Sequence, residues 1–158
     1  MANTQSMTTS FMQELFTGTH NFGVGVVRGS TAADTFKAAL YLTSATVDAA
    51  TTAYSTTGEV TGTNYTAGGV TITNAYNPSS TNTSATAGTA FWTPSASFVY
   101  TNVTLSTAFD AVLIYNSTQA DKAVSVHTFG SQTVTAGTFT LTMPVNDATT
   151  GLLRLATT

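Results

Sequence analysis

Residues 109–115 read Phe-Asp-Ala-Val-Leu-Ile-Tyr, a run that is apolar on both faces of an extended chain apart from Asp110. A strand with two apolar faces is typical of the middle of a β-sheet, where other parts of the protein cover both sides. The run is rich in β-branched and aromatic residues, which favour strands. It therefore predicts the central strand of a sheet.

Shorter segments with a period of two surround this strand in the sequence. Apolar residues alternate with polar or small ones at residues 36–42, 70–73, 98–103, 124–126, 138–143 and 153–155. About eight short strands separated by turn residues indicate a sandwich or barrel. We predict an all-β fold, an antiparallel β-sandwich or jelly roll with one short N-terminal helix.

The same alternation predicts which residues form the core and where the chain turns. The expected core comprises Phe36, Leu40, Ile72, Trp92, Val103, Leu113, Phe139, Leu141 and Leu153. Turn-forming residues stand at Thr57-Gly58 and at 67–69, 77–80, 129–131 and 136–137, and each cluster predicts a turn between two strands.

The first 22 residues have a different pattern. Ser10 begins a segment with capping-box spacing, Phe11, Met12, Leu15 and Phe16 form an apolar face, and Gly18 follows. This pattern predicts a helix over residues 10–17. We expect an N-terminal arm over residues 1–22 and a single β-sandwich domain over residues 23–158. Phe11, Leu15 and Phe16 are candidate docking residues for a neighbouring subunit; the alternative is that the helix caps its own sandwich.

Composition excludes several classes of function. The 158 residues include four Lys or Arg, seven Asp or Glu and no Cys. Four scattered cations cannot neutralise a run of phosphates, so no nucleic-acid partner is expected. No stretch approaches the ~18–20 apolar residues of a membrane span, and no signal-peptide pattern is present, so no membrane partner is expected. The absence of cysteine excludes disulfides, thiolate zinc sites and thiol catalysis.

The chain offers few residues for acid–base or nucleophilic chemistry. Ser125 shares a strand face with His127, but a catalytic triad would also need an orienting acid such as Asp110 or Asp121. No nucleophile-elbow motif, paired acids for glycoside hydrolysis or calcium-loop motif accompanies them. We therefore expect no enzyme activity, no cofactor and no metal. The aromatic residues Tyr54, Tyr65, Tyr76, Trp92, Tyr100 and Tyr115 suggest a sugar-stacking platform; the alternative is that they pack in the core.

Glu59 stands at the head of a glycine-rich turn that includes Tyr65, Gly68 and Gly69. In a chain with so few acids, this position predicts a structural carboxylate that accepts hydrogen bonds from backbone N–H groups of the loop. The alternative is a solvated glutamate.

Residues 35–41 (TFKAALY) and 53–69 (AYSTTGEVTGTNYTAGG) resemble a family of small structural proteins of tailed bacteriophages, whose pattern is close to FKVALY…AYSTTGEVTGTGYTAGG. The agreement continues through residues 101–104, 113–116, 129–130 and 152–155, and it covers nearly the whole chain from about residue 10. Asn64 stands where a glycine is usual, and residues 23–33 look like an insertion. Asparagine tolerates the left-handed conformation that such a turn requires.

The resemblance implies a virion protein that is assembled in the bacterial cytoplasm. The leading hypothesis is a capsid decoration (cement) protein that binds the major capsid protein as a homo-oligomer; a trimer would suit local three-fold positions. The alternatives are a tail or head–tail component bound to tail proteins, or a glycan-binding receptor-recognition tip.

Overall fold

The computed structural model describes residues 2–16, 18–23, 33–81, 83 and 87–156, apart from the side chain of Phe16. The elements in chain order are β1 (Ser6–Met7), α1 (Thr9–Phe16), β2 (Phe36–Leu42), β3 (Val70–Thr71), β4 (Ser79–Ser80), β5 (Thr89–Trp92), β6 (Phe98–Asn116), β7 (Lys122–Leu141) and β8 (Leu153–Ala156). In this part of the chain the strands form two antiparallel sheets beside one short helix, which confirms the all-β prediction. The jelly-roll topology stays a prediction.

The chain forms two compact units, each built from several segments. The first unit comprises residues 1–20, 34–71 and 99–140, and the second comprises residues 21–33, 72–98 and 141–158. The predicted boundary between an arm of residues 1–22 and a sandwich of residues 23–158 stays a prediction. The predicted insertion at residues 23–33 falls mostly outside the described residues.

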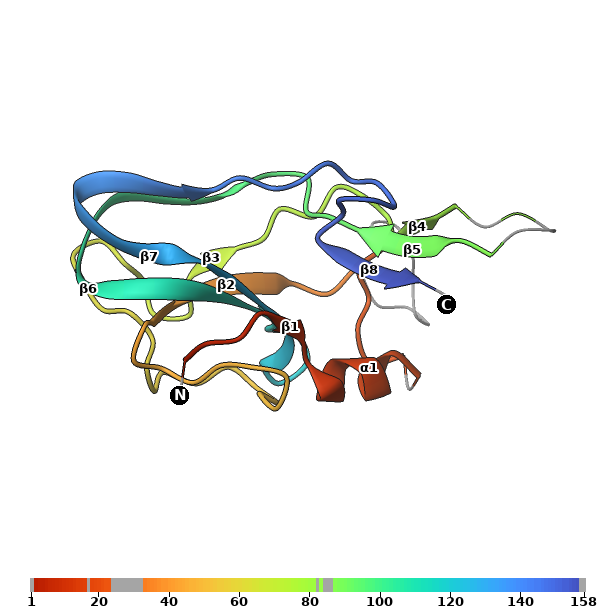
Figure 1. Ribbon diagram of the computed structural model, residues 1–158, viewed down its shortest axis with the longest axis horizontal. Coiled ribbons are helices and arrows are strands. Elements are labelled where there is room, and N and C mark those ends of the chain that lie inside the picture. The colour runs from red at the N-terminus through yellow and green to blue at the C-terminus, as the bar shows by residue number, and fades with distance from the viewer. Residues whose placement is uncertain (1, 17, 24–32, 82, 84–86, 157–158) are drawn as a thin grey trace. The chain divides into compact units, whose positions relative to one another are not determined.

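The first unit contains a five-stranded sheet in the order β1-β7-β6-β2-β3 (Figure 1). Strand β6 is in the middle, and residues 109–115 within it are almost entirely buried, which confirms the prediction of a central strand. Strand β2 pairs antiparallel with this segment, with Leu40 opposite Val112 and Ala38 opposite Ile114. Both faces of β2 are buried at residues 38–41, because Ala45, Val47 and Tyr54 of the following connection pack on Ala39 and Tyr41.

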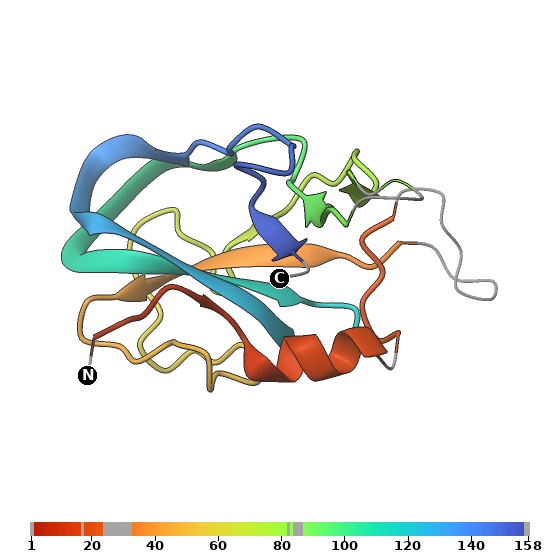
Figure 2. The same ribbon diagram turned by 45° about the vertical axis from the view of Figure 1, so that its right-hand side comes forward.

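Strands β6 and β7 are 19 and 20 residues long, and both bend strongly within the first unit (Figure 2). The predicted turns at residues 129–131 and 136–137 are wrong, because β7 continues through both. Pairing with β6 keeps the chain extended through these residues. The backbone is locally irregular at Ala136, which has a left-handed φ of 44°, but strand β7 does not end there.

Seven of the nine predicted core residues are buried; Phe139 and Leu141 are only partly buried. Both lie in the distal half of β7, where most side chains are exposed or partly buried. Phe139 instead joins an aromatic group, with its ring centroid 5.0 Å from that of Phe109 and 5.5 Å from that of Phe129.

Helix α1 begins one residue earlier than predicted, and its cap is Thr8 rather than Ser10. The hydroxyl of Thr8 accepts a hydrogen bond from the backbone N–H of Phe11 at 3.3 Å, as an N-cap side chain does. Thr8 also ties the helix to the sheet, because its backbone N–H donates to Val124 O at 3.0 Å. Gly18 adopts a left-handed φ of 65° shortly after the helix, as its C-terminal position predicts.

The second unit contains a three-stranded sheet in the order β4-β5-β8. The predicted turn at residues 77–80 is partly wrong, because Ser79 and Ser80 form β4 and pair with β5. Trp92 of β5 is buried, with its ring 4.7 Å from that of Phe22, and its indole N–H lies 3.1 Å from both Asn74 Oδ1 and Tyr76 O. Trp92 is therefore a core residue and not part of a sugar-stacking platform.

Candidate functional site

The carboxylate of Glu59 is the centre of a hydrogen-bonded turn in the first unit. Glu59 is only 6% exposed. Its Oε1 accepts hydrogen bonds from Gly68 N at 2.7 Å and from the Tyr65 hydroxyl at 2.8 Å, and its Oε2 accepts one from the Tyr54 hydroxyl at 2.6 Å. The sequence predicted backbone donors; the structure adds the two tyrosines, whose positions depend on the folded loop.

This carboxylate also affects the tyrosines that contact it. Burial, reinforced by the negative charge of Glu59, raises the pKa of Tyr54 and of Tyr65 above the ordinary value of 10. Both phenols therefore remain protonated donors at neutral pH. The hydroxyl of Tyr65 in turn accepts a hydrogen bond from Leu40 N at 3.0 Å, which fixes the loop against β2.

The glycines of the turn allow it to approach β2 closely. Gly69 has a φ of 71°, and a Cβ there would lie 1.7 Å from Ala38 O. Gly68 has a φ of 88°, and its carbonyl accepts a hydrogen bond from the Tyr115 hydroxyl at 2.9 Å. A side chain at residue 69 would displace the loop, so the structure requires a glycine at this position.

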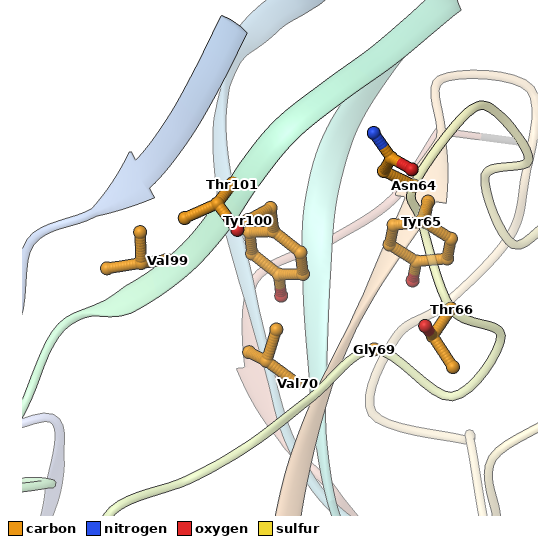
Figure 3. Close-up of a pocket in the computed structure, with 8 residues that line it drawn as sticks. All are labelled: Asn64, Tyr65, Thr66, Gly69, Val70, Val99, Tyr100 and Thr101. Carbon is orange, nitrogen blue, oxygen red and sulfur yellow. The ribbon is translucent and has the colours of Figure 1, made fainter.

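A hollow of about 120 Å³ lies beside this turn. It is lined by Asn64, Tyr65, Thr66, Gly69, Val70, Val99, Tyr100 and Thr101. Figure 3 shows Tyr65 on the loop that leads into β3 and Tyr100 on β6. The two rings stack with centroids 6.0 Å apart and planes inclined by 18°. Of the six aromatic residues considered for a platform, these two come together at a hollow.

Two asparagines with left-handed backbones shape the rim of this hollow. Asn64 has a φ of 59° and Asn102 a φ of 52°, and Nδ2 of Asn64 donates to Asn102 O at 2.8 Å. The backbone at Asn102 breaks the alternation of β6, so that Tyr100 and Val103 are both buried. Asn64 thus adopts the left-handed conformation that a glycine at this position would supply.

The predicted docking residues of the N-terminal helix have different environments. Phe11 is 2% exposed and packs edge-on against His20, with ring centroids 5.0 Å apart. Leu15 is partly buried, and the side chain of Phe16 is outside the described residues. Met12 is exposed on the other side of the helix. The burial of Phe11 within its own unit supports the alternative in which the helix caps its own sheet.

Helix α1 also contributes to a buried polar cluster that sequence reasoning missed. The Glu14 carboxylate contacts Nε2 of His20 at 2.7 Å and pairs with Lys122. The Asn116 side-chain amide lies 3.0 Å from Nδ1 of His20 and donates to Asp34 at 2.8 Å. Because the cluster joins three distant segments, with Glu14 and His20 in the first, Asp34 in the second and Asn116 and Lys122 in the third, no single local motif could have predicted it.

Burial and hydrogen bonding shift the pKa values of His20 and Glu14 in this cluster. Burial lowers the pKa of His20, although the carboxylate of Glu14 opposes this effect. For Glu14, burial raises the pKa, but hydrogen bonds from Lys122 and His20 and the positive charge of Lys122 outweigh it and hold the pKa below its usual value. A neutral His20 that donates from Nε2 to Glu14 and accepts at Nδ1 from Asn116 satisfies both partners.

The Ser125–His127 pair considered for catalysis lies in β7. The Ser125 hydroxyl and His127 Nε2 are 3.0 Å apart, and burial lowers the pKa of His127 to about 4. The acids considered as orienting groups are engaged or positioned elsewhere. Asp110 accepts a hydrogen bond from Asn3 at 2.6 Å, and Asp121 is exposed between β6 and β7.

One edge of β7 is open along most of its length. Strand β1 pairs with β7 only at Ser125 and Val126. Beyond them, no described strand pairs with residues 128–140 on the side away from β6. Residues 123–143 contain no Lys, Arg, Asp, Glu or Pro, the residue types with which natural proteins commonly protect such edges.

Comparisons with known proteins add no relative. No family model matches the chain, and no curated protein or solved structure shows significant similarity to it. The resemblance to small virion proteins of tailed bacteriophages therefore stays a prediction. In the described segments, no helix is long and apolar enough to cross a membrane, and no group of three or more His, Asp or Glu is placed to hold a metal ion.

Proposed function

We propose that this chain is a non-enzymatic structural protein of a tailed-bacteriophage virion, which decorates the capsid as a homo-oligomer bound to the major capsid protein. The resemblance carried by residues 35–41 and 53–69 supports the virion assignment. The structural observation that carries the proposal is the open, uncharged edge of β7 at residues 128–140.

An open strand edge presents unpaired backbone N–H and C=O groups to any neighbouring chain. Pairing this edge with a neighbour would satisfy those groups, and residues 123–143 carry no Lys, Glu or Pro to oppose it. A specific contact buries roughly 800 Å² on each partner, and an oligomer multiplies weak contacts through effective concentration. Such an interface depends on shape and backbone hydrogen bonds, which a chain with few charges can supply.

The proposal is tested by adding the purified protein to particles that lack it. Emptied heads and isolated tails of the phage that encodes the chain are sedimented with the protein at ionic strengths of about 0.1 M and 1 M. Decoration predicts saturable binding to heads, with little change between the two salt concentrations, because few ion pairs contribute. Binding to tails alone would support the tail alternative, and binding to neither would overturn a virion role.

A further inference from the structure

We propose that the hollow between residues 64–70 and 99–101 binds a single neutral saccharide ring. This binding activity is additional to capsid attachment and does not depend on it. The volume of about 120 Å³ is far above the ~10–15 Å³ that one water requires, and well below the ~300 Å³ or more of a pocket for a larger ligand. The hollow therefore suits one ring of a glycan, and the other rings of that glycan would lie outside it.

A small apolar part of the lining can contact the apolar face of a sugar ring. The partly exposed Tyr65 ring stacks on the ring of Tyr100, which is only 3% exposed, with centroids 6.0 Å apart. The side chains of Val70 and Val99 also line the space. Figure 3 shows Val70 below the two rings. The C–H groups of a pyranose can pack on such aromatic and aliphatic surfaces.

The rim of the hollow supplies polar groups for sugar hydroxyls. Asn64 uses its Nδ2 to bond Asn102 O, which leaves its Oδ1 as an acceptor. Thr66, on the loop that leads into β3, and Thr101, on β6, line opposite sides of the hollow, and both residues are exposed. Hydroxyl and amide groups can each donate to or accept from a sugar hydroxyl, so the three side chains can fix the orientation of a ring.

The lining contains no charged residue, which favours a neutral ligand over an anionic one. Two opposite charges lie behind it: the buried carboxylate of Glu59, hydrogen-bonded to the Tyr65 hydroxyl at 2.8 Å, and the ammonium of Lys37, 3.2 Å from where a Cβ on Gly68 would stand. These opposite charges leave no net positive charge behind the hollow to attract phosphate, sulfate or sialic acid. An apolar side chain of a protein partner is a poorer match, because polar groups from Asn64, Thr66 and Thr101 would lose water without a partner.

The hollow is held rigidly by its surroundings. Three residues at or beside it, Asn64, Gly69 and Asn102, have left-handed φ values between 52° and 71°. Left-handed conformations are uncommon for residues other than glycine, and those of Asn64 and Asn102 are of the kind that concentrates at functional sites. The Tyr65 hydroxyl is clamped between Glu59 and Leu40 N, so the ring is positioned before any ligand arrives. Preorganisation reduces the entropy lost on binding.

The test uses saturation-transfer NMR on the full chain with maltohexaose, cellohexaose and chitohexaose, and with sialyllactose as an anionic probe. We expect at least one neutral probe to bind with a dissociation constant of about 1 mM, as suits a single-ring site. Amide shifts should be confined to residues 64–70 and 99–101. Saturation transfer from none of the neutral probes would overturn the proposal, as would preferential binding of sialyllactose.

A matched pair of variants locates the site. Thr101→Arg puts a long side chain into the mouth of the hollow and should abolish saturation transfer, whereas Thr107→Arg, exposed further along β6 and outside the hollow, should leave it unchanged. Thr66→Arg from the opposite rim provides a second blocking variant if Thr101→Arg does not fold. Equal binding by the folded blocking variant and by Thr107→Arg would contradict the proposal.

Discussion

The Tyr65 hydroxyl donates a hydrogen bond of 2.8 Å to Oε1 of Glu59 and accepts one of 3.0 Å from Leu40 N. This single phenol joins the glycine-rich turn, the buried carboxylate and strand β2. The same residue presents its ring to the hollow beside Tyr100. The stability of the turn and the shape of the hollow are therefore coupled through Glu59.

Replacing Glu59 with Ala should destabilise the protein strongly. The change leaves Gly68 N and the hydroxyls of Tyr54 and Tyr65 without their acceptor. Each unsatisfied buried donor costs ~1–3 kcal/mol, so we expect a loss of about 3 kcal/mol or more in the free energy of unfolding, measured with urea. Thr61→Ala, at an exposed position in the same loop, is the control. A Glu59→Ala variant as stable as Thr61→Ala would show that the carboxylate is not structural.

Two glycine-to-alanine substitutions should have opposite consequences. At Gly69 the new Cβ would meet Ala38 O at 1.7 Å, on a backbone with a φ of 71°. At Gly130, in β7, a Cβ would meet nothing within 4 Å. We expect Gly69→Ala to lower the melting temperature sharply or prevent folding, and Gly130→Ala to change stability by less than about 1 kcal/mol. Similar melting temperatures for the two variants would contradict the described packing of the turn on β2.

Acidification should destabilise the protein through His127. The pKa of His127 is about 4 in the folded chain and near 6.5 in the unfolded chain, so the unfolded state binds more protons between these values. Stability is therefore complete above pH 6.5 and falls as the pH is lowered toward 4, by at most ~1.4 kcal/mol per pH unit from this residue. Burial of His20 acts in the same direction.

Urea unfolding of the protein and of His127→Gln at pH 7 and pH 5 measures this contribution. The variant should lose less stability than the unaltered protein over this interval, because glutamine does not titrate. An identical loss in both proteins would show that His127 titrates normally in the folded state.

Much of the central sheet could be predicted from the sequence, because its strands are recognisable from the pattern of apolar residues within each short segment. The run at residues 109–115 and the alternation at 36–42 identify strands whose faces are covered. The course of β7 was not predictable in this way. Gly130 and the Ala136–Gly137 pair are typical of turns, but pairing with β6 keeps the chain extended through them. Tertiary pairing here overrides local turn preference.

The candidate sites were also only partly predictable from the sequence, because they depend on contacts between distant segments. A lone acid before two glycines was enough to predict a structural role for Glu59, but Tyr54 and Tyr65 reach it only because the loop folds back. The hollow also depends on the left-handed backbone of Asn102, which changes the direction of the side chains along β6. The sequence gives no reliable indication of this conformation. The cluster around Glu14 likewise joins residues that are distant in the chain.

Lysines introduced on the open edge of β7 should weaken attachment to capsids without unfolding the protein. Thr133 and Thr135 are exposed in the unpaired part of the strand. A Thr133→Lys, Thr135→Lys double variant protects the edge as natural edge strands are protected. We expect an unchanged melting temperature and at least about a tenfold loss of affinity for emptied heads. Thr61→Lys should bind normally. Normal binding by the double variant would exclude this edge as the docking surface.

The copy number of the chain per virion tests capsid decoration most directly. Virions of the phage that encodes it are separated into emptied, tail-less heads and isolated tails, and the chain is quantified in each fraction by mass spectrometry against the major capsid protein. Decoration of a symmetric lattice predicts on the order of hundreds of copies, all on the heads. About a dozen copies or fewer, or their loss with the tails, would contradict decoration and support a tail component.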